Sequence, residues 1–379
     1  MDWRWGKYTK YFLGLEKARQ TKKTITSLYD RSGNITHDQS EILNIEKKYY
    51  ENLYSSSNPD YEIVKSYIQN TEIDRKLSSS ESNVCDGKLT IEECTEAIFK
   101  MKLNRSPGSD GIPVEFYRKF WSSLKYLLVK VCNIGYDLEE MSNSQKMGTI
   151  SLIFKKNDPH DLNNYRPITL MNIDTKLIAY TLALRLKKVI HLIINDDQCG
   201  YIKNRFIGFN IRKIQDIIDY AEKLNISGAI LFLDFSKAFD SLEWDFMFEA
   251  LKKFGFNDSF LKWIKTLYNN IKGSIVNNGW VSEPYSIRRG IKQGCPLSSL
   301  IFVIAVEILA TKIRKENGLK GFEIKYNKSK CTLKISQMAD DATIFLKSKE
   351  EVSNVLNIIE IFGSISGLIL NKSKTEGNG

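Results

Sequence analysis

The apolar residues of this chain recur with two spacings, one typical of strands and one typical of helices. Residues 229–233 form an unbroken apolar run of the length expected for a buried central strand. Residues 150–154, 332–337 and 342–346 form short stretches of strand type, and 273–280 closes on Asn278-Gly279, a hairpin turn signal. These segments predict short strands, two of them followed by tight turns.

Between these strands, apolar residues recur every three to four positions, which predicts amphipathic helices. Segments with this period cover 41–54, 94–101, 117–131, 174–193, 207–221 and 300–313. Thr90-Ile91-Glu92-Glu93 has the form of a capping box before the second of them. The chain is therefore predicted to mix helices with short strands.

An acidic residue stands at the end of the buried strand. Asp234 follows Leu233 directly, and a helix is predicted soon after it, with Asp240 or Ser241 as its N-cap. An aspartate at the exposed end of a buried strand is held by a rigid element, where it can bind a catalytic metal. Most aspartates in that position merely cap the next helix, so the pattern alone leaves both interpretations open.

A second acidic site lies between the stretches 332–337 and 342–346. Met338-Ala339-Asp340-Asp341 separates them, which predicts a β-hairpin with both carboxylates at its tip. Asp234 and Asp340 are 340 − 234 = 106 positions apart, so folding alone can bring them together. Their like charges would then need cations, and Mg²⁺ suits carboxylate oxygens. Two such ions about 3.5–4 Å apart can activate a primer 3′-hydroxyl and stabilise leaving pyrophosphate, which is nucleotidyl transfer.

Composition narrows the class of partner. The chain of 379 residues carries a net charge of +10, which suits a polyanion, although a merely basic soluble protein has the same balance. Its six cysteines contain no Cys-x-x-Cys pair, and its three histidines are far apart, which argues against a zinc site. No apolar run reaches the ~18 residues of a membrane span, so no membrane partner is predicted.

The two acidic motifs resemble those of a known family. Phe-Leu-Asp-Phe-Ser-Lys-Ala-Phe-Asp at 232–240 and Met-Ala-Asp-Asp at 338–341 are similar to the first and third palm motifs of reverse transcriptases of non-LTR (LINE-type) retrotransposons. Further segments that resemble the family's motifs lie at 104–111, 163–170, 197–205, 289–299 and 366–374. The resemblance thus extends over almost the whole chain.

The resemblance implies an α+β right-hand polymerase with fingers and palm, an antiparallel palm sheet covered by helices on one face, and a missing thumb. It implies a basic, helical N-terminal extension over 1–86, with a turn at 30–34, a fingers region over 87–206 and a palm over 207–379. The reverse transcriptase domain as a whole is expected at about 137–379. Aromatic and basic residues near the start of the extension are candidates for tracking a phosphate backbone, or for a solvated helix face.

The resemblance also assigns roles to single residues. Asp234, Asp340 and Asp341 would be catalytic and hold the metal, and Lys374 would protonate pyrophosphate. Lys155, Arg166, Phe239, Gln293 and Gly294 would bind the dNTP, and Lys203 and Arg205 the nucleic acid, with Arg205 facing the template. Structural alternatives remain for three of them: Lys155 as a solvated strand end, Phe239 as core, and Lys374 as a solvated terminal lysine. Asp240 is expected to be a cap or salt-bridge partner and no metal ligand.

The function implied is RNA-directed DNA polymerisation with two Mg²⁺ ions, or Mn²⁺ in their place. Its partners would be an RNA template, a DNA primer, dNTPs and, as a further candidate, an element-encoded RNA-binding protein. The resemblance implies a cytoplasmic ribonucleoprotein and the nucleus as locations. The alternative is a truncated, catalytically inactive remnant that still binds nucleic acid, and a similar RNA polymerase or maturase is less favoured by the motifs.

Four residues depart from the family's pattern: Asn204 for a glycine, Lys292 for arginine, Ser299 for proline, and Met338 for an aromatic residue. Asparagine is the next-best residue after glycine for a positive φ angle. The methionine is flexible enough to fill the space of an aromatic ring. The departures at 299 and 338, together with the expected absence of a thumb, motivate the alternative of an inactive remnant.

Overall fold

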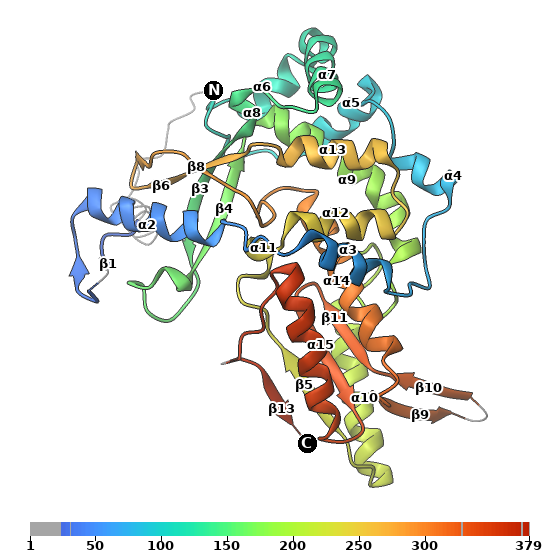
Figure 1. The fold of residues 1–379 in the computed structure, drawn as a ribbon. Helices are drawn as coiled ribbons and strands as arrows, with labels where there is room; N and C mark the ends of the chain where they lie inside the picture. The colour runs from blue at the N-terminus through green and yellow to red at the C-terminus, as the bar shows by residue number, and fades with distance from the viewer. Residues whose placement is uncertain (1–23, 31, 327–328, 373, 379) are drawn as a thin grey trace, which may run out of the picture.

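The computed structural model describes residues 24–378 except 31, 327–328 and 373, and these residues form a mixed arrangement of helices and strands (Figure 1). The two larger sheets lie one above the other in Figure 1, with β3, β4 and β6 in the upper half and β5, β11 and β13 in the lower half. The predicted nucleic-acid contacts near the start of the chain fall within 1–23, outside the described residues.

The lower sheet contains the strands on which the acidic motifs lie. Its order is β11 (Ile335–Met338), β12 (Asp341–Leu346), β5 (Ala229–Leu233) and β13 (Glu376–Asn378), and every pairing is antiparallel. The apolar run at 229–233 is therefore an interior strand, because β12 and β13 pair with its two edges. This confirms the predicted buried strand and the predicted hairpin at 338–341.

Helices pack on both faces of this sheet. Leu231, Leu233 and Ile344 on one face join the main core with α14 (Ser298–Lys315) and α15 (Glu351–Ser366). Phe345, on the other face, is buried in a separate cluster with Ile217 of α10 (Ile207–Leu224). The prediction of helices on one face is therefore wrong, because successive strand residues point to opposite faces and Phe345 supplies an apolar surface to the second one.

The upper sheet joins strands that are distant in the sequence. Its order is β4 (Tyr165–Met171), β3 (Met147–Phe154), β6 (Lys272–Asn277) and β7 (Trp280–Val281), and β8 (Tyr285–Ser286) pairs with β6. The β3–β6 pairing is parallel. Asn278 and Gly279 both have positive φ, 51° and 81°, as the predicted Asn-Gly hairpin turn requires.

The other described elements surround these sheets. Two small hairpins pair β1 (Leu28–Tyr29) with β2 (Ile35–Thr36) and β9 (Phe322–Tyr326) with β10 (Ser329–Leu333). The further helices are α2 (Gln39–Leu53), α3 (Tyr61–Gln69), α4 (Ser79–Ser82), η1 (Asn83–Cys85), α5 (Ile91–Lys100), α6 (Val114–Lys119), α7 (Trp121–Leu138), α8 (Asn143–Lys146), η2 (Leu162–Asn164), α9 (Ile173–Ile193), α11 (Ala238–Ser241), α12 (Trp244–Lys253) and α13 (Asp258–Tyr268).

The N-terminal part of the described chain is less helical than predicted. The turn at 30–34 is confirmed, because the Asp30 carboxylate accepts hydrogen bonds from the backbone amides of Ser32 and Asn34. The residues on either side of it pair as β1 and β2, so the described part of this predicted helical extension contains a short hairpin beside its helices. The predicted capping box at Thr90 and the helix predicted at 41–54 are both observed.

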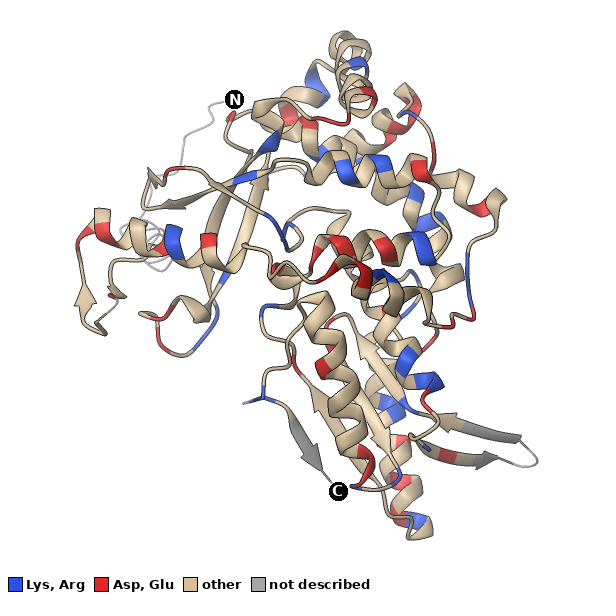
Figure 2. Ribbon diagram, viewed as in Figure 1, with Lys and Arg blue, Asp and Glu red and all other residues tan. Residues whose placement is uncertain are grey.

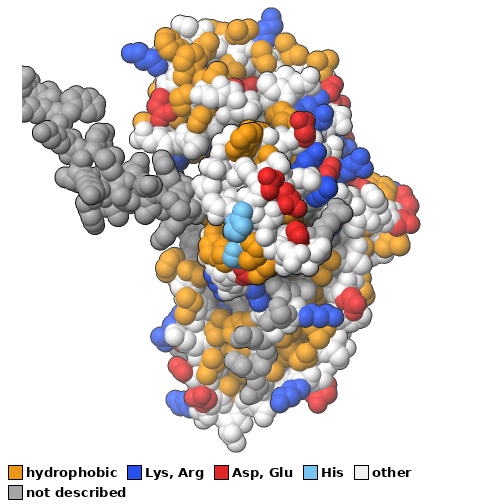
Figure 3. Space-filling view, turned by 90° about the vertical axis from the view of Figure 1, so that its left-hand side faces the viewer, with side chains coloured by type: hydrophobic (Ala, Val, Ile, Leu, Met, Phe, Trp, Pro, Cys, Tyr) orange, Lys and Arg blue, Asp and Glu red, His pale blue; other side chains and the backbone are white. Residues whose placement is uncertain are grey.

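One cluster of buried apolar side chains extends from Ile25 to Leu368 and includes residues from both larger sheets. The elements therefore pack as parts of a shared core, and the divisions at 86 and 206 stay predictions. Lys, Arg, Asp and Glu are spread over the molecule (Figure 2), and the face in Figure 3 mixes hydrophobic with charged side chains. Among the described helices, none is both long and apolar enough to cross a membrane.

A buried carboxyl group fastens α2 to the upper sheet. Glu46 Oε1 accepts a hydrogen bond of 3.0 Å from Asn277 Nδ2, and Asn277 also bonds the backbone of Ile25. Burial raises the pKa of Glu46 to about 8. The folded protein therefore holds this group protonated at a pH where the unfolded chain has released the proton.

We expect this group to make folding stability fall with rising pH between about 4.5 and 8. The folded state binds more protons in that window, so the free energy of unfolding should fall by about 1.4 kcal/mol per pH unit from this group. Urea unfolding of Glu46→Gln at several pH values should show a shallower dependence than the wild type. Glu51→Gln, an exposed substitution on the same helix, is the control, and equal slopes in all three proteins would contradict the prediction.

Candidate active site

The predicted site residues meet at a cleft between the two larger sheets. The cleft has a volume of ≈ 1470 Å³. Of the residues to which the sequence assigns a role, those that line it are Lys155, Arg166, Asp234, Phe239, Gln293, Gly294, Asp340, Asp341 and Lys374. Lys203 and Arg205 are not among the lining residues.

Strand pairing brings the acidic residues to one end of the lower sheet. Ala342 of β12 lies opposite Leu233 of β5, so Asp341 and Asp234 follow at the next position on adjacent strands. Met338 pairs with Asp341, which leaves Ala339 and Asp340 in the turn. Residues 106 positions apart thus meet at the same edge of the cleft.

The carboxylates interact electrostatically. Burial raises the pKa of Asp340, and the nearby charge of Asp234 adds to this shift. Burial also raises the pKa of Asp341, with further contributions from Asp340 and Asp234. A buried group of like charges favours protonation or a bound cation.

Asp234 has two partners from the end of the chain. Asn371 Nδ2 donates a hydrogen bond of 3.1 Å to Asp234 Oδ2, and Lys374 Nζ lies 3.6 Å from the same oxygen. The backbone amide of Asn371 also donates to the Asp234 carbonyl, at 2.7 Å. Asn371 was not assigned a role from the sequence, although it lies within the last motif-like segment.

The residues present fit a magnesium site in their chemistry. Aspartate oxygens are the ligands that Mg²⁺ prefers, and the repulsion among the three carboxylates would be relieved by a cation. Within the described residues, no three His, Cys, Asp or Glu side chains form a group that could hold a metal as they stand. Mg²⁺ usually binds through one or two carboxylates with substrate phosphates as further ligands, so a complete protein cage is not required.

Basic side chains line the same cleft as the three carboxylates. The lysines and arginines that line it are Lys100, Lys102, Arg105, Lys155, Lys156, Arg166, Lys176, Lys237, Lys292 and Lys374. Burial lowers the pKa of Lys155, and the neighbouring Arg166 lowers it further. Burial also lowers the pKa of Lys237 and of Lys292 to about 8 each. A polyanionic ligand would relieve this crowding of positive charge.

The loop after α9 holds the turn that carries Asp340. Gln198 is fully buried, and its Oε1 accepts hydrogen bonds from the backbone amides of Gly200 and Ala339, at 2.7 and 2.9 Å. Ala339 has a φ of 59°, which a non-glycine residue adopts only with support from its surroundings. A Cβ at Gly200 would lie 2.5 Å from the Ala339 amide nitrogen, so glycine is required at this approach.

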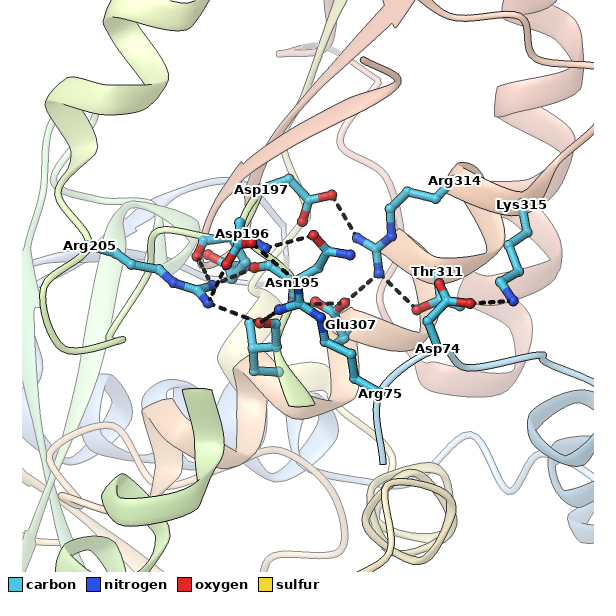
Figure 4. Close-up of polar contacts among 12 residues, drawn as sticks. Asp74, Arg75, Asn195, Asp196, Asp197, Arg205, Glu307, Thr311, Arg314 and Lys315 are labelled. Atoms are coloured by element: carbon cyan, nitrogen blue, oxygen red, sulfur yellow. Dashed lines mark hydrogen bonds and ion pairs between the residues drawn. The ribbon is translucent and has the colours of Figure 1, made fainter. Parts of the chain in front are cut away.

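The same loop is fastened to α14 and to Arg75 by ion pairs (Figure 4). Arg314 lies 2.7 Å from Asp197 and also pairs with Glu307. Arg75 pairs with Asp196 at 3.2 Å. These contacts give the loop a fixed position against the lower sheet.

Arg205 belongs to this network and does not reach the cleft. Its guanidinium donates to the carbonyls of Ile194, Asn195 and Gln198 and pairs with Asp196 (Figure 4). Three carbonyls of the segment after α9 thus hold donors of Arg205, and its expected role toward the template stays a prediction. Asn204 has a φ of 65°, as predicted from its replacement of glycine.

Among the residues that the structure describes, Asp240 is neither an N-cap nor a partner in a salt bridge, which corrects both expectations. It lies in α11, and α12 begins at Trp244 after Glu243, so Ser241 is not the cap either. The Asp240 carboxylate is buried and accepts hydrogen bonds from Tyr54 and Gln293. Burial raises its pKa to about 6, and these hydrogen bonds act in the opposite direction.

The family of the chain follows from comparison with known proteins. Residues 153–378 match the family described as reverse transcriptase (RNA-dependent DNA polymerase). The match covers more than half of the chain, and the chain belongs to this family.

The relatives are proteins of mobile elements. The chain is 28% identical over 369 residues to the Transposon TX1 uncharacterized 149 kDa protein of Xenopus laevis, a match that covers 97% of this chain and 28% of that protein. It is 25% identical over 323 residues to the Retrovirus-related Pol polyprotein from type-2 retrotransposable element R2DM of Drosophila melanogaster, a match that covers 83% of this chain and 29% of that protein. It is 21% identical over 271 residues to the RNA-directed DNA polymerase from mobile element jockey of Drosophila funebris, a match that covers 69% of this chain and 28% of that protein.

The chain thus spans less than a third of the length of these three relatives. The kinship with non-LTR retrotransposon polymerases expected from the sequence is confirmed. The expectation of a missing thumb stays a prediction, because a piece of this length does not define the whole protein.

We predict that Gln198→Ala destabilises the Asp340 turn. The substitution leaves two buried amides without their acceptor, which should lower the free energy of unfolding by about 2 kcal/mol or more. Urea unfolding would give this value, and hydrogen exchange at 339–341 should become faster. Gln69→Ala, at an exposed position of α3, is the control. A loss no larger than that of the control would contradict the role given to Gln198.

Proposed function

We propose that this chain is the polymerase region of a LINE-type retroelement protein and adds dNTPs to a primer 3′-hydroxyl on an RNA template by a two-metal-ion mechanism. The observation that carries the proposal is the meeting of Asp234 with Asp340 and Asp341 at one edge of a basic cleft. The family supports the same conclusion. Carboxylates in such a place serve phosphoryl chemistry, and the surrounding cations suit a polyanionic substrate.

In this proposal the lower sheet with α14 and α15 is the palm, and the upper sheet is part of the fingers. The palm carries the carboxylates on strand ends, where the backbone is fixed by pairing on both sides. The fingers carry the phosphate-binding side chains. The cleft between the sheets would then hold the primer end, the template base and the dNTP.

Asp234 and Asp340 would hold two Mg²⁺ ions, with Asp341 beside them and Mn²⁺ as a substitute. Bound there, the ions would activate the 3′-hydroxyl and stabilise the charge on leaving pyrophosphate. Lys374 would give a proton to that pyrophosphate, and its place 3.6 Å from Asp234 supports this role. Asn371 would keep the Asp234 carboxylate in one orientation.

Lys155 and Arg166 would bind the triphosphate. The register of the upper sheet supports this, because Ile153 of β3 pairs with Arg166 of β4 and the Lys155 amide bonds the Asn164 carbonyl. The two side chains thus start from the end of β3 and from the adjacent strand β4, and both line the cleft. An ammonium group and a planar guanidinium fork together neutralise phosphate oxygens.

Phe239 would exclude the 2′-hydroxyl of a ribonucleotide. One face of its ring stacks on Phe302, with centroids 4.4 Å apart, and the side chain also lines the cleft. The stacking restricts the ring, which a steric gate requires. Gly294, with a φ of 106° and its backbone close to the Thr169 carbonyl, would let the nascent base pair approach.

The partners proposed are the RNA template, the DNA primer and dNTPs, with an element-encoded RNA-binding protein as a further candidate. Lys203, on the loop after α9, would contact the nucleic-acid backbone, whereas the donors of Arg205 are used within that loop. A cytoplasmic ribonucleoprotein and the nucleus are the proposed locations.

Primer extension tests the proposed function. Purified chain with Mg²⁺, a polyribonucleotide template and a DNA primer should incorporate dNTPs, and Asp340→Asn should lower kcat by about 100-fold or more, since metal charge supplies several kcal/mol of transition-state stabilisation. Asp219→Asn, the same change of charge at an exposed position of α10, should leave the rate unchanged. Salt-dependent template binding without any extension would favour the inactive remnant.

Substitution of Phe239 tests the selection of the sugar. Phe239→Ala should raise ribonucleotide incorporation relative to dNTP by about tenfold or more, because the ring no longer fills the space of the 2′-hydroxyl. Phe248→Ala, at a half-buried phenylalanine outside the cleft, is the control. Unchanged sugar selectivity in Phe239→Ala would contradict the proposed exclusion of the 2′-hydroxyl, and Phe239 would then be a core residue only.

A further inference from the structure

Gln293 is held at the cleft by an aspartate that is almost completely buried. Its Nε2 donates to both oxygens of Asp240, at 2.9 and 2.8 Å, and its backbone carbonyl accepts from the Thr169 amide at 2.8 Å. Asp240 is 1% exposed. An ionised carboxylate accepts and does not donate hydrogen bonds, so it selects the NH₂ end of the Gln293 amide.

The carbonyl oxygen of the Gln293 side chain is available to a ligand in the cleft. Gln293 lines the cleft, and its Oε1 accepts no hydrogen bond from the described residues. The side chain therefore offers an acceptor to whatever occupies the cleft. A flipped amide would offer a donor, so the Asp240 carboxylate decides the hydrogen-bonding character of this surface.

Asp240 is in turn held by a residue far upstream. The Tyr54 hydroxyl donates to Asp240 Oδ1 at 3.0 Å, and Tyr54 is 5% exposed. Tyr54 is the C-cap residue of α2 and lies outside the range 153–378 that matches the family. Its hydroxyl is thus a contribution to the cleft from a part of the chain that the family match does not include.

The backbone around Tyr54 is fastened to the segment that carries Gln293. The Tyr54 carbonyl accepts from the amides of Arg288 and Arg289, at 2.9 and 3.2 Å. Arg289 Nε donates to the Leu53 carbonyl at 2.8 Å. The Ile291 amide bonds the Phe239 carbonyl at 2.7 Å, so the chain on both sides of Asp240 and before Gln293 is fixed.

We propose that Tyr54 and Asp240 are positioning residues for the incoming nucleotide. They hold the Gln293 amide with Nε2 inward and Oε1 toward the cleft, where it accepts a hydrogen bond from a hydroxyl or amino group of the nucleotide. Both residues would act on the nucleotide through Gln293. This inference rests on the proposed polymerase function, and it adds that the upstream helix α2 completes the nucleotide-binding surface.

Steady-state primer extension by the full chain tests the inference. Tyr54→Phe removes one hydrogen bond to a charged group and should raise KM for dNTP about tenfold, with kcat changed less. Tyr50→Phe is the matched control: Tyr50 lies buried on the same helix, and its hydroxyl has no hydrogen-bond partner among the described residues. Tyr50→Phe should leave KM unchanged. A fall in kcat at constant KM in Tyr54→Phe would mean a smaller folded fraction, and would overturn the inference.

A second variant removes the selection of the amide orientation. In Asp240→Asn, one oxygen that faces Gln293 Nε2 becomes an NH₂ group, so the two donors conflict unless an amide turns. KM for dNTP should rise at least as much as in Tyr54→Phe, while the melting temperature shows whether the variant folds. An unchanged KM in a folded Asp240→Asn protein would also overturn the inference.

A spectroscopic measurement separates this inference from the proposed function. In full chain labelled with ¹⁵N-glutamine, the Gln293 side-chain amide signal is assigned by its loss in Gln293→Asn. Tyr54→Phe should shift this signal and Tyr50→Phe should not. If the wild type extends no primer but the signal depends on Tyr54, the proposed function fails while the link from Tyr54 to Gln293 stands. If the wild type extends primers and Tyr54→Phe leaves the signal unchanged, the inference fails while the proposed function stands.

Discussion

The antiparallel pairing of β5 with β12 is the constraint on which the rest of the site depends. It places the ends of two strands from distant parts of the chain side by side, and an aspartate stands at each end. Pairing fixes these positions to within the register of a sheet, where a shift by one residue would turn each side chain to the opposite face. The buried faces of both strands oppose such a shift, because Leu231 and Ile344 lie on one face and Phe345 on the other. Apolar packing thus stabilises an arrangement that electrostatic repulsion alone would separate.

Carboxylates repel one another at the cleft, and so do lysines, and the two groups of opposite charge lie around the same space. The carboxylates meet at one edge, and buried lysines with lowered pKa values line other parts of it. Lys374, from the last part of the chain, lies 3.6 Å from Asp234. Such an arrangement is unfavourable for the empty protein and favourable once cations and phosphates enter together, which is characteristic of sites for charged substrates.

Local patterns were sufficient to predict the elements that carry the acidic residues. The buried strand, the hairpin with its two aspartates and the Asn-Gly turn each depend on a few adjacent residues, and the structure has all three. Asp240 was predicted wrongly and the partners of Arg205 were not predicted, because tertiary packing sets these contacts. Tyr54 is 186 positions from Asp240, and the carbonyls that hold Arg205 are exposed by the end of a helix. The helix α10 was predicted, but its packing on the second face of the lower sheet was not, since Ile217 and Phe345 belong to separate amphipathic segments.

The position of β5 in its sheet has a consequence for synthesis of the chain. Both of its partners, β12 and β13, lie nearer the C-terminus, so this apolar strand leaves the ribosome with neither edge paired. The first residue of β12 follows the last residue of β5 by 341 − 233 = 108 positions. At about 5–20 residues per second that interval is roughly 5 to 20 s, during which an aggregation-prone edge is exposed. Helices α12 to α14 are made within this interval, and they give the nascent chain a surface on which one face of β5 can be buried before its neighbouring strands arrive.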